Sequence, residues 1–201
     1  MYNFFVRLVR LYYKVLFGVR FHGTENFPME GGVLICSNHL SNNDPVLIAA
    51  NIFKRLRFMA KKELFNVPVL SAVVKFFGAF PIDRSTSDLG AVRATMSILK
   101  GGNALVIFPE GRRNKEFLPE KIKPGAVNIA AKAGVPIMPV YIKGTYRLFG
   151  KTELFFGKPI PVEKLRDVVE SAATNSENKN KTLSKFLYDS IINAEGDCTV
   201  D

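Results

Sequence analysis

Short apolar runs alternate with helical runs along this 201-residue chain, and the alternation predicts an α/β protein. We expect a mainly parallel or mixed sheet covered by helices on both faces, preceded by an N-terminal amphipathic helix at a membrane interface. A second observation is the run Gly32–Ser37, which is apolar enough for a short buried strand. A third is the placing of glycine: Gly101-Gly102 and Gly134 follow helical runs, where the left-handed conformation ends a helix.

Residues 1–20 favour an amphipathic helix. Arg7, Arg10 and Lys14 are spaced by three and four residues, so they share one helical face. The rest of the helix is apolar or aromatic and comprises Phe4, Phe5, Leu8, Leu11, Tyr12, Val15 and Leu16. A cationic stripe on such a helix is typical of an element in a membrane interface, whereas a spanning helix needs about 20 mainly apolar residues. The alternative is a helix packed on the domain with its basic face in water.

Residues 21–165 are expected to form the α/β core. The expected strands are the short apolar runs Arg20–Gly23, Gly32–Ser37, Arg57–Ala60, Ala79–Ile82, Asn103–Phe108, Ile137–Ile142 and Leu154–Phe156. The expected helices between them are Pro45–Phe53, Val69–Phe77, Asp88–Leu99 and Ala126–Lys132. The first of these helices begins with Asp44 as its cap and Pro45 at its first position, because proline's fixed φ suits that position.

Residues 166–201 are expected to form a helical tail on the same globular domain. Residues 162–172 favour a helix that leads into it, and Leu183–Ala194 could form a last amphipathic helix. The stretch Asn175–Lys181 is polar and predicts a linker, and Glu195–Asp201 predicts a frayed end. A chain of this length is expected to be one domain with a substantial core.

The composition indicates an anionic partner. The formal net charge is +10, which suits nucleic acid or a membrane surface with acidic lipids. The only two cysteines, Cys36 and Cys198, give no disulfide framework and fit a reducing compartment. Histidines and cysteines with ligand spacing are too few for a structural zinc site.

The stretch Asn38–Pro45 contains one of the two histidines, His39, and a carboxylate five residues later, Asp44. A neutral imidazole can take a proton from an alcohol near pH 7 when a carboxylate fixes its tautomer and stabilises the imidazolium. The stretch lacks a protein nucleophile, so this pair predicts that the substrate supplies the attacking hydroxyl. The alternative is an ordinary loop histidine beside a helix cap.

Two further clusters place cations after expected strands. Arg84 follows one strand, and Arg112 and Arg113 follow Phe108-Pro109-Glu110-Gly111 at the end of another. Ligands of α/β proteins bind beyond the carboxyl ends of the strands, so these loops can meet the His39 loop in one crevice. The rigid fork of arginine suits phosphate, which predicts an anion-binding set. The alternative is that these arginines are solvated or paired with nearby acids.

These motifs resemble those of the glycerolipid acyltransferase superfamily, and most closely those of its bacterial 1-acyl-sn-glycerol-3-phosphate acyltransferases. The matching segments follow the family's order and spacing over residues 21–160 and are His39 with Asp44, Ala60–Leu64, Gly78–Arg84, Phe108–Gly111 and Val135–Val140. The third motif departs from the usual Phe-Pro-Glu-Gly-Thr-Arg-Ser, because Arg112 replaces Thr and Asn114 replaces Ser, while Arg113 keeps the arginine position. An extra cation at Arg112 could change the headgroup that is bound.

The resemblance implies a role for each matching residue. His39 would remove the proton of the acceptor hydroxyl, and Asp44 would hold the imidazole. The residues that would hold the acceptor phosphate or shape its pocket are Arg84, Lys61, Arg113, Glu110 and Gly111. The acyl chain would lie in an apolar groove lined from Val69 to Phe80.

The resemblance also implies the substrates and the location. Acyl-CoA or acyl-carrier protein would donate an acyl group to the sn-2 hydroxyl of lysophosphatidate, at the cytoplasmic face of the cell membrane, in a peripheral or monotopic protein. The resemblance implies no metal or prosthetic group. Glycerol-3-phosphate or another lyso-lipid is the alternative acceptor. A basic nucleic-acid-binding module is the alternative of another class, but the aromatic residues lie in apolar runs and no nucleic-acid motif occurs, so no nucleic acid is expected.

Overall fold

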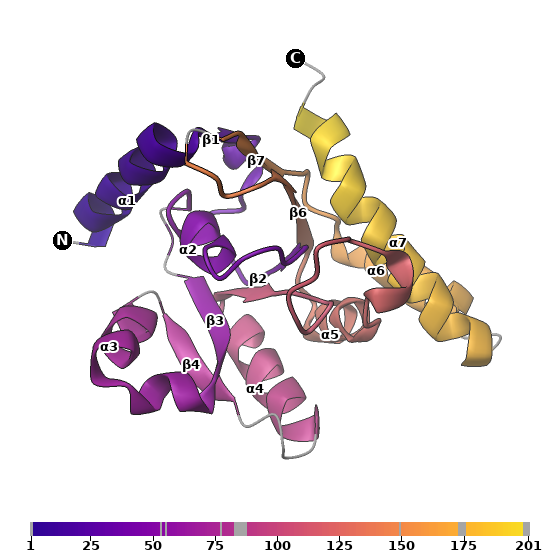
Figure 1. Cartoon of the computed structure of the whole chain (residues 1–201). Coiled ribbons are helices and arrows are strands. Elements are labelled where there is room, and N and C mark those ends of the chain that lie inside the picture. The colour runs from indigo at the N-terminus through magenta and orange to yellow at the C-terminus, as the bar shows by residue number, and fades with distance from the viewer. Residues whose placement is uncertain are drawn as a thin grey trace.

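The structure is a computed structural model that describes residues 2–52, 54, 56–76, 78–82, 88–148, 150–172 and 176–198. Within these residues a 7-stranded sheet has the order β1-β7-β6-β2-β5-β3-β4 (Figure 1). The strands are β1 (Val19–His22), β2 (Val33–Ser37), β3 (Leu56–Lys61), β4 (Ala79–Ile82), β5 (Ala104–Ile107), β6 (Ile137–Gly144) and β7 (Thr152–Phe156). Every pairing in this sheet is parallel except that of β6 with β7.

The central strand β2 sets the position of the site. It pairs with β5 on one side, where Cys36 lies opposite Ile107, and with β6 on the other, where Cys36 lies opposite Pro139. All five residues of β2 are buried, as expected for a parallel strand covered on both faces. The carboxyl ends of β2, β5 and β6 therefore meet at one edge of the sheet, and their loops can converge there.

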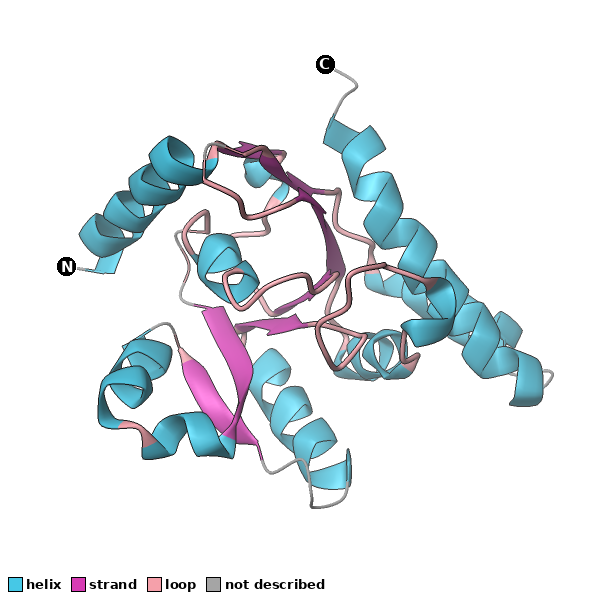
Figure 2. Cartoon of the chain, in the orientation of Figure 1, coloured by secondary structure: helices cyan, strands magenta, loops and turns pink. Residues whose placement is uncertain are grey.

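Helices cover both faces of the sheet (Figure 2). They are α1 (Tyr2–Phe17), α2 (Asp44–Ala49), α3 (Pro68–Phe76), α4 (Asp88–Lys100), α5 (Gly125–Ala133), α6 (Val162–Ser171) and α7 (Ser176–Cys198), with short 3₁₀ turns η1 (Thr24–Asn26), η2 (Lys62–Asn66) and η3 (Pro119–Lys121). On one face Ile35 of β2 packs in a cluster with α2 and with the aromatic side of α1. On the other face Leu34 packs with residues of α4, α5, α6 and α7. The predicted α/β class with a mixed sheet between helices is confirmed.

The predicted tail is wrong in detail. Helix α7 begins at Ser176 and ends at Cys198, so residues 176–181 of the predicted polar linker and residues 195–198 of the predicted frayed end are helical, whereas Asn175 lies outside the described residues. Leu183, Leu187 and Ile191 are fully buried against the sheet and anchor the helix in its middle. A helix that is nucleated by such packing extends through polar residues at low cost, because each added residue gains a backbone hydrogen bond. Local polarity therefore gave a misleading boundary.

Helix α2 is shorter than predicted and ends at Ala49; Phe53, the predicted last residue, lies outside the described residues. Helix α1 has one buried side and one exposed side. Val6 is buried and Tyr13 and Phe17 pack against the core, whereas Leu8 and Leu11 are exposed. None of the helices in the described ranges has both the length and the hydropathy needed to cross a bilayer.

Candidate active site

The site forms where the loops after β2 and β5 meet. The backbone N–H of His39 donates to Glu110 Oε2 at 2.7 Å, and the backbone N–H of Asn114 donates to the His39 carbonyl at 2.9 Å. His39 follows β2 and Glu110 follows β5, and these strands are neighbours in the sheet. The parallel pairing thus brings together two loops that lie 71 residues apart in the chain.

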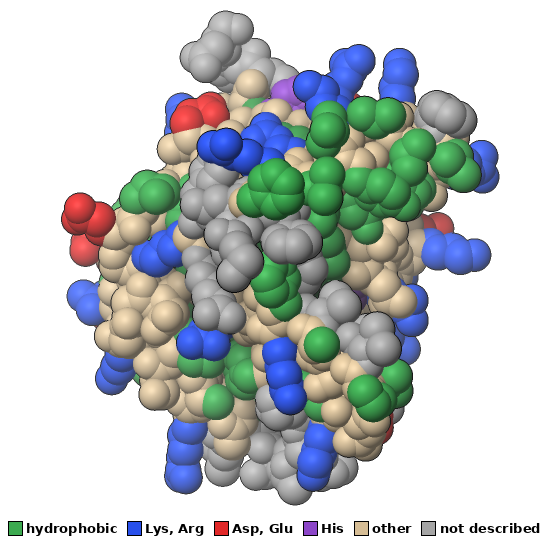
Figure 3. All heavy atoms as spheres, turned by 90° about the vertical axis from the view of Figure 1, so that its left-hand side faces the viewer, with side chains coloured by type: hydrophobic (Ala, Val, Ile, Leu, Met, Phe, Trp, Pro, Cys, Tyr) green, Lys and Arg blue, Asp and Glu red, His purple; other side chains and the backbone are tan. Residues whose placement is uncertain are grey.

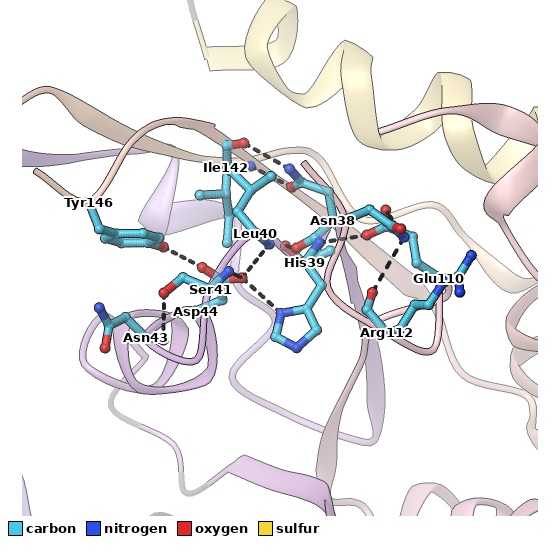
Figure 4. A network of polar contacts seen from close by, with 12 residues as sticks. Asn38, His39, Leu40, Ser41, Asn43, Asp44, Glu110, Arg112, Ile142 and Tyr146 are labelled. Carbon is cyan, nitrogen blue, oxygen red and sulfur yellow. Dashed lines mark hydrogen bonds and ion pairs between the residues drawn. The ribbon is translucent and has the colours of Figure 1, made fainter. Parts of the chain in front are cut away.

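Asn38 fixes the same loop to β6. Its side-chain N–H₂ donates to the Ile142 carbonyl at 2.8 Å, and its Oδ1 accepts from the Ile142 N–H at 2.8 Å. The side chain is buried, and both of its polar ends are satisfied, which makes the contact specific. The Asn38 side chain thus pairs with the backbone of β6 as a neighbouring strand would, and it holds the backbone from which His39 projects (Figure 4).

His39 and Asp44 form the predicted pair. Nδ1 of His39 lies 2.8 Å from Oδ2 of Asp44 (Figure 4). Because a carboxylate can only accept, the hydrogen-bond network assigns the proton to Nδ1 and leaves Nε2 as the basic nitrogen. Phe108 stacks on the imidazole with ring centroids 4.0 Å apart, and no described side chain hydrogen-bonds to Nε2. The imidazole is thereby oriented with its basic nitrogen available to a substrate.

The Asp44 carboxylate is fully buried and surrounded by donors. Its Oδ2 also accepts from the backbone N–H groups of Leu40 at 2.7 Å and Ser41 at 2.8 Å. The hydroxyl of Tyr146 donates to Oδ1. These hydrogen bonds offset the cost of removing a carboxylate from water.

The prediction that Asp44 caps α2 is wrong. Asn43 holds the N-cap position without a side-chain cap, and Asp44 is the first helical residue, so Pro45 takes the second helical position instead of the predicted first. The carboxylate turns back onto the preceding N–H groups of Leu40 and Ser41 instead of onto the helix. This backward turn is what places Oδ2 against the imidazole.

Glu110 lies on the other side of His39 and is 6% exposed. Its Oε1 accepts from the Asn114 side chain at 2.9 Å, while Oε2 accepts from the His39 N–H. Burial raises the Glu110 pKa above its usual range, although these two hydrogen bonds act in the opposite direction. Both carboxylate oxygens bind protein donors, so in this structure Glu110 holds the His39 backbone. Asn114, one of the two departures from the third motif, supplies one of those donors.

The turn after Glu110 carries several cations. Gly111 has a φ of 69°, and Arg112 and Arg113 follow it, exposed and without an ion pair among the described residues. A Cβ atom added at Gly111 would lie 3.7 Å from Nζ of Lys123, so this ammonium group sits beside the turn. Sequence reasoning missed Lys123, because a lysine 12 residues further along carries no local signal.

Two other predicted cations lie outside the described side chains. Arg84 lies outside the described residues, and so does the side chain of Lys61, whose backbone ends β3. Cys36 lies near the site but is fully buried, and burial raises the pKa of its thiol, so it is no nucleophile. In the described part of the chain, no group of three or more histidine, cysteine or acidic side chains could hold a metal ion.

Comparison with known proteins decides the family. Residues 18–143, more than half of the chain, match the family model described as "Acyltransferase". The chain belongs to the acyltransferase family. This acyltransferase is 31% identical over 166 residues to the 1-acyl-sn-glycerol-3-phosphate acyltransferase of Bacillus subtilis, covering 80% of this chain and 82% of that relative. It is also 30% identical over 183 residues to the enzyme of that name from Streptococcus pneumoniae, covering 87% and 68%.

The fold of this acyltransferase also occurs in a solved structure. The crystal structure of the 1-acyl-sn-glycerophosphate acyltransferase from Thermotoga maritima matches it with a TM-score of 0.69 at 24% identity, over 96% of this chain and 81% of that chain. The resemblance drawn from the sequence motifs is therefore confirmed at the level of the family and the fold. The protein is an enzyme that transfers acyl groups.

Proposed function

We propose that this acyltransferase transfers an acyl group from acyl-CoA or acyl-carrier protein to the sn-2 hydroxyl of lysophosphatidate, which gives phosphatidate. The observation that carries the proposal is the His39–Asp44 pair, in which a buried carboxylate 2.8 Å from Nδ1 leaves Nε2 as the base. The names of the relatives from Bacillus subtilis and Streptococcus pneumoniae support this acceptor.

In the proposed reaction, Nε2 of His39 takes the hydroxyl proton as the acceptor oxygen attacks the thioester carbonyl. The tetrahedral intermediate then collapses, the C–S bond breaks, and the thiolate leaves and can receive the proton from Nε2. Asp44 stabilises the imidazolium that forms in between. General-base catalysis is typically worth about 10²–10⁴-fold, so the positioning of both substrates must contribute as well.

The proposed phosphate site lies around the turn that follows β5. Arg84 would hold the acceptor phosphate, with Lys61 and Arg113 in support, because arginine binds phosphate through two parallel hydrogen bonds. Glu110 and Gly111 would shape the wall of this pocket. The segment from Val69 to Phe80 would line the groove for the acyl chain. No metal or prosthetic group takes part in these steps.

The proposed membrane contact uses the exposed side of α1. Leu8, Leu11 and Val15 are 52%, 57% and 60% exposed, and Arg7 and Lys14 are exposed among them. Figure 3 looks onto this side of the molecule, where hydrophobic side chains gather across the upper part and Lys and Arg side chains surround them. Apolar side chains that point into water, next to cations, favour an anionic bilayer over a helix whose apolar face is wholly packed on the domain.

The proposed attachment is peripheral or monotopic, at the cytoplasmic face of the cell membrane, where both thioester donors occur. In this arrangement residues 1–20 form the membrane-associating helix, residues 21–165 the catalytic core, and residues 166–201 a helical tail that packs on the core. The buried Val6 and the packed Tyr13 tie the helix to the core and so hold the site close to the bilayer.

A direct assay tests the proposal. The purified protein is incubated with labelled acyl-CoA or acyl-carrier protein and with vesicles that contain lysophosphatidate, and labelled phosphatidate is measured. Parallel incubations with glycerol-3-phosphate and with lysophosphatidylcholine test the alternative acceptors, because the additional cation at Arg112 could change which headgroup is bound. Faster acylation of either alternative acceptor than of lysophosphatidate would contradict the proposed substrate.

A further inference from the structure

The second oxygen of the Asp44 carboxylate has a partner that no sequence motif indicates. Oδ2 binds His39 and the two loop N–H groups, whereas Oδ1 accepts from the hydroxyl of Tyr146 (Figure 4). Tyr146 lies in the loop between β6 and β7, 102 residues from Asp44 in the chain. This contact exists only because β6 is the neighbour of β2 in the sheet.

We propose that Tyr146 is a positioning residue for acyl transfer, whose hydroxyl fixes the rotation of the Asp44 carboxylate. This inference rests on the proposed role of His39 and Asp44. A carboxylate can rotate about its Cβ–Cγ bond, and a donor on each oxygen removes that freedom. With Oδ1 held by Tyr146, Oδ2 stays in the plane in which it meets Nδ1 of His39.

The loop that carries Tyr146 is itself held in place. The Thr152 hydroxyl donates to the Thr145 carbonyl at 3.0 Å, and the backbone N–H of Arg147 donates to the same carbonyl at 2.8 Å. The N–H of Gly150 donates to the Arg147 carbonyl at 2.8 Å, which closes the loop. The Tyr146 ring packs against the apolar cluster beneath α2, so the hydroxyl is delivered to Asp44 by a fixed scaffold.

Tyr146 is a neutral donor throughout the working pH range. Its burial, together with the neighbouring Asp44 charge, raises the pKa of the phenol above its ordinary value. Among the described residues, the other groups around the pair are Tyr13 of α1, whose pKa is also raised by burial, and Glu110 with Lys121 beyond the His39 backbone. The Tyr146 hydroxyl also interacts with Tyr13, but both phenols have a raised pKa and stay neutral, so the effect of removing the Tyr146 hydroxyl on the pH profile reports on the His39–Asp44 pair.

The sign of that effect follows from charge. When His39 and Asp44 together hold the shared proton, they form an imidazolium and a carboxylate, and the pair is neutral overall. When that proton is lost, the pair carries one negative charge. A donor to the carboxylate stabilises the negatively charged state more than the neutral one. Loss of the Tyr146 hydroxyl should therefore destabilise the negatively charged state of the pair relative to the neutral one. The acidic limb of the kcat profile should move to higher pH.

The test compares Tyr146→Phe with Tyr141→Phe, using oleoyl-CoA and oleoyl-lysophosphatidate in vesicles. Tyr141 lies on the opposite face of the sheet, packed with the cluster under α7, so its variant removes a hydroxyl away from the site. Tyr146→Phe should lower kcat about 10–100-fold with both KM values within about twofold, and move the acidic limb up by roughly half a unit or more. Tyr141→Phe should leave all of these unchanged.

A second variant separates the effect of the hydrogen bond from an effect of altered packing. Tyr146→3-fluorotyrosine keeps the ring and makes the hydroxyl a stronger donor, so the acidic limb should move to lower pH. A fall in kcat with an unmoved limb in both variants would overturn the positioning role and leave Tyr146 a packing residue. Wild-type protein that forms no phosphatidate would instead refute the proposed function, so the two failures are distinguishable.

Discussion

Replacing Asp44 by asparagine separates the charge of this residue from its geometry. The two loop N–H groups of Leu40 and Ser41 need an acceptor at the Oδ2 position, so the asparagine carbonyl should take that position. Its N–H₂ group then faces the Tyr146 hydroxyl, which can accept as well as donate. The carbonyl still accepts from Nδ1 of His39, so the tautomer is kept and only the negative charge is lost.

The size of the effect follows from that charge. Two unit charges about 4 Å apart attract by about 4 kcal/mol at an effective dielectric constant near 20, and about 1.4 kcal/mol corresponds to a tenfold change in rate. The remaining carbonyl keeps part of the attraction. Asp44→Asn should therefore lower kcat by about 10²–10³-fold, with little change in either KM or in the melting temperature.

Steady-state kinetics on vesicles that contain lysophosphatidate, combined with thermal melting, check this prediction. The imidazolium loses its partner, so the acidic limb of the kcat profile should move to lower pH, opposite to the shift for Tyr146→Phe. Asp189→Asn, which removes an exposed carboxylate paired with Lys185 on α7, is the matched control. Asp44→Asn activity above about a tenth of wild type would refute the assigned role of the charge.

Three further predictions concern the neighbouring carboxylate, the phosphate site and the membrane helix. Burial raises the Glu110 pKa, so the stability of the wild type should fall as the pH rises through the folded-state pKa. The melting temperature of Glu110→Gln should therefore rise relative to that of the wild type as the pH increases, and a difference that stays constant with pH would contradict this. Arg84→Ala should weaken acceptor binding by about 1.5–3 kcal/mol, seen as a higher KM for lysophosphatidate; an equal rise for the donor would remove Arg84 from the acceptor site. Leu8→Ser with Leu11→Ser should reduce vesicle flotation at any salt concentration, whereas Lys14→Glu should do so only on anionic vesicles at low salt. Unchanged flotation of both variants would place the membrane contact elsewhere.

The fold was predictable because its signals are local. The buried run of β2 and the glycine that ends α5 are read from a few adjacent residues, and the structure places both as expected. The start of α7 was not predictable in this way, because its polar first turns are helical through packing further along the chain. Packing of this kind depends on which helices and strands become neighbours, and the local patterns of a single sequence do not reveal those neighbours.

The candidate site likewise has contacts between residues close in the sequence, which were predictable, and contacts between distant residues, which were not. His39 and Asp44 are five residues apart, so one loop can bring them together and their pairing could be predicted. The contacts of Asn38 with Ile142 and of Tyr146 with Asp44 join residues 104 and 102 positions apart. They arise from the order of β2 and β6 in the sheet, which local patterns do not contain. The cap assignment for Asp44 was wrong because a carboxylate that caps a helix and one that turns back onto the preceding loop have the same sequence pattern.

The most direct test of the central claim is the rate of phosphatidate formation by His39→Ala relative to wild type. The two proteins are compared with labelled acyl donor and lysophosphatidate at matched concentrations, with thermal melting to confirm that both are folded. If Nε2 of His39 is the base that activates the acceptor hydroxyl, turnover by the folded variant should fall by about 10²–10⁴-fold or more. A folded His39→Ala protein that keeps most of the wild-type rate would contradict the mechanism.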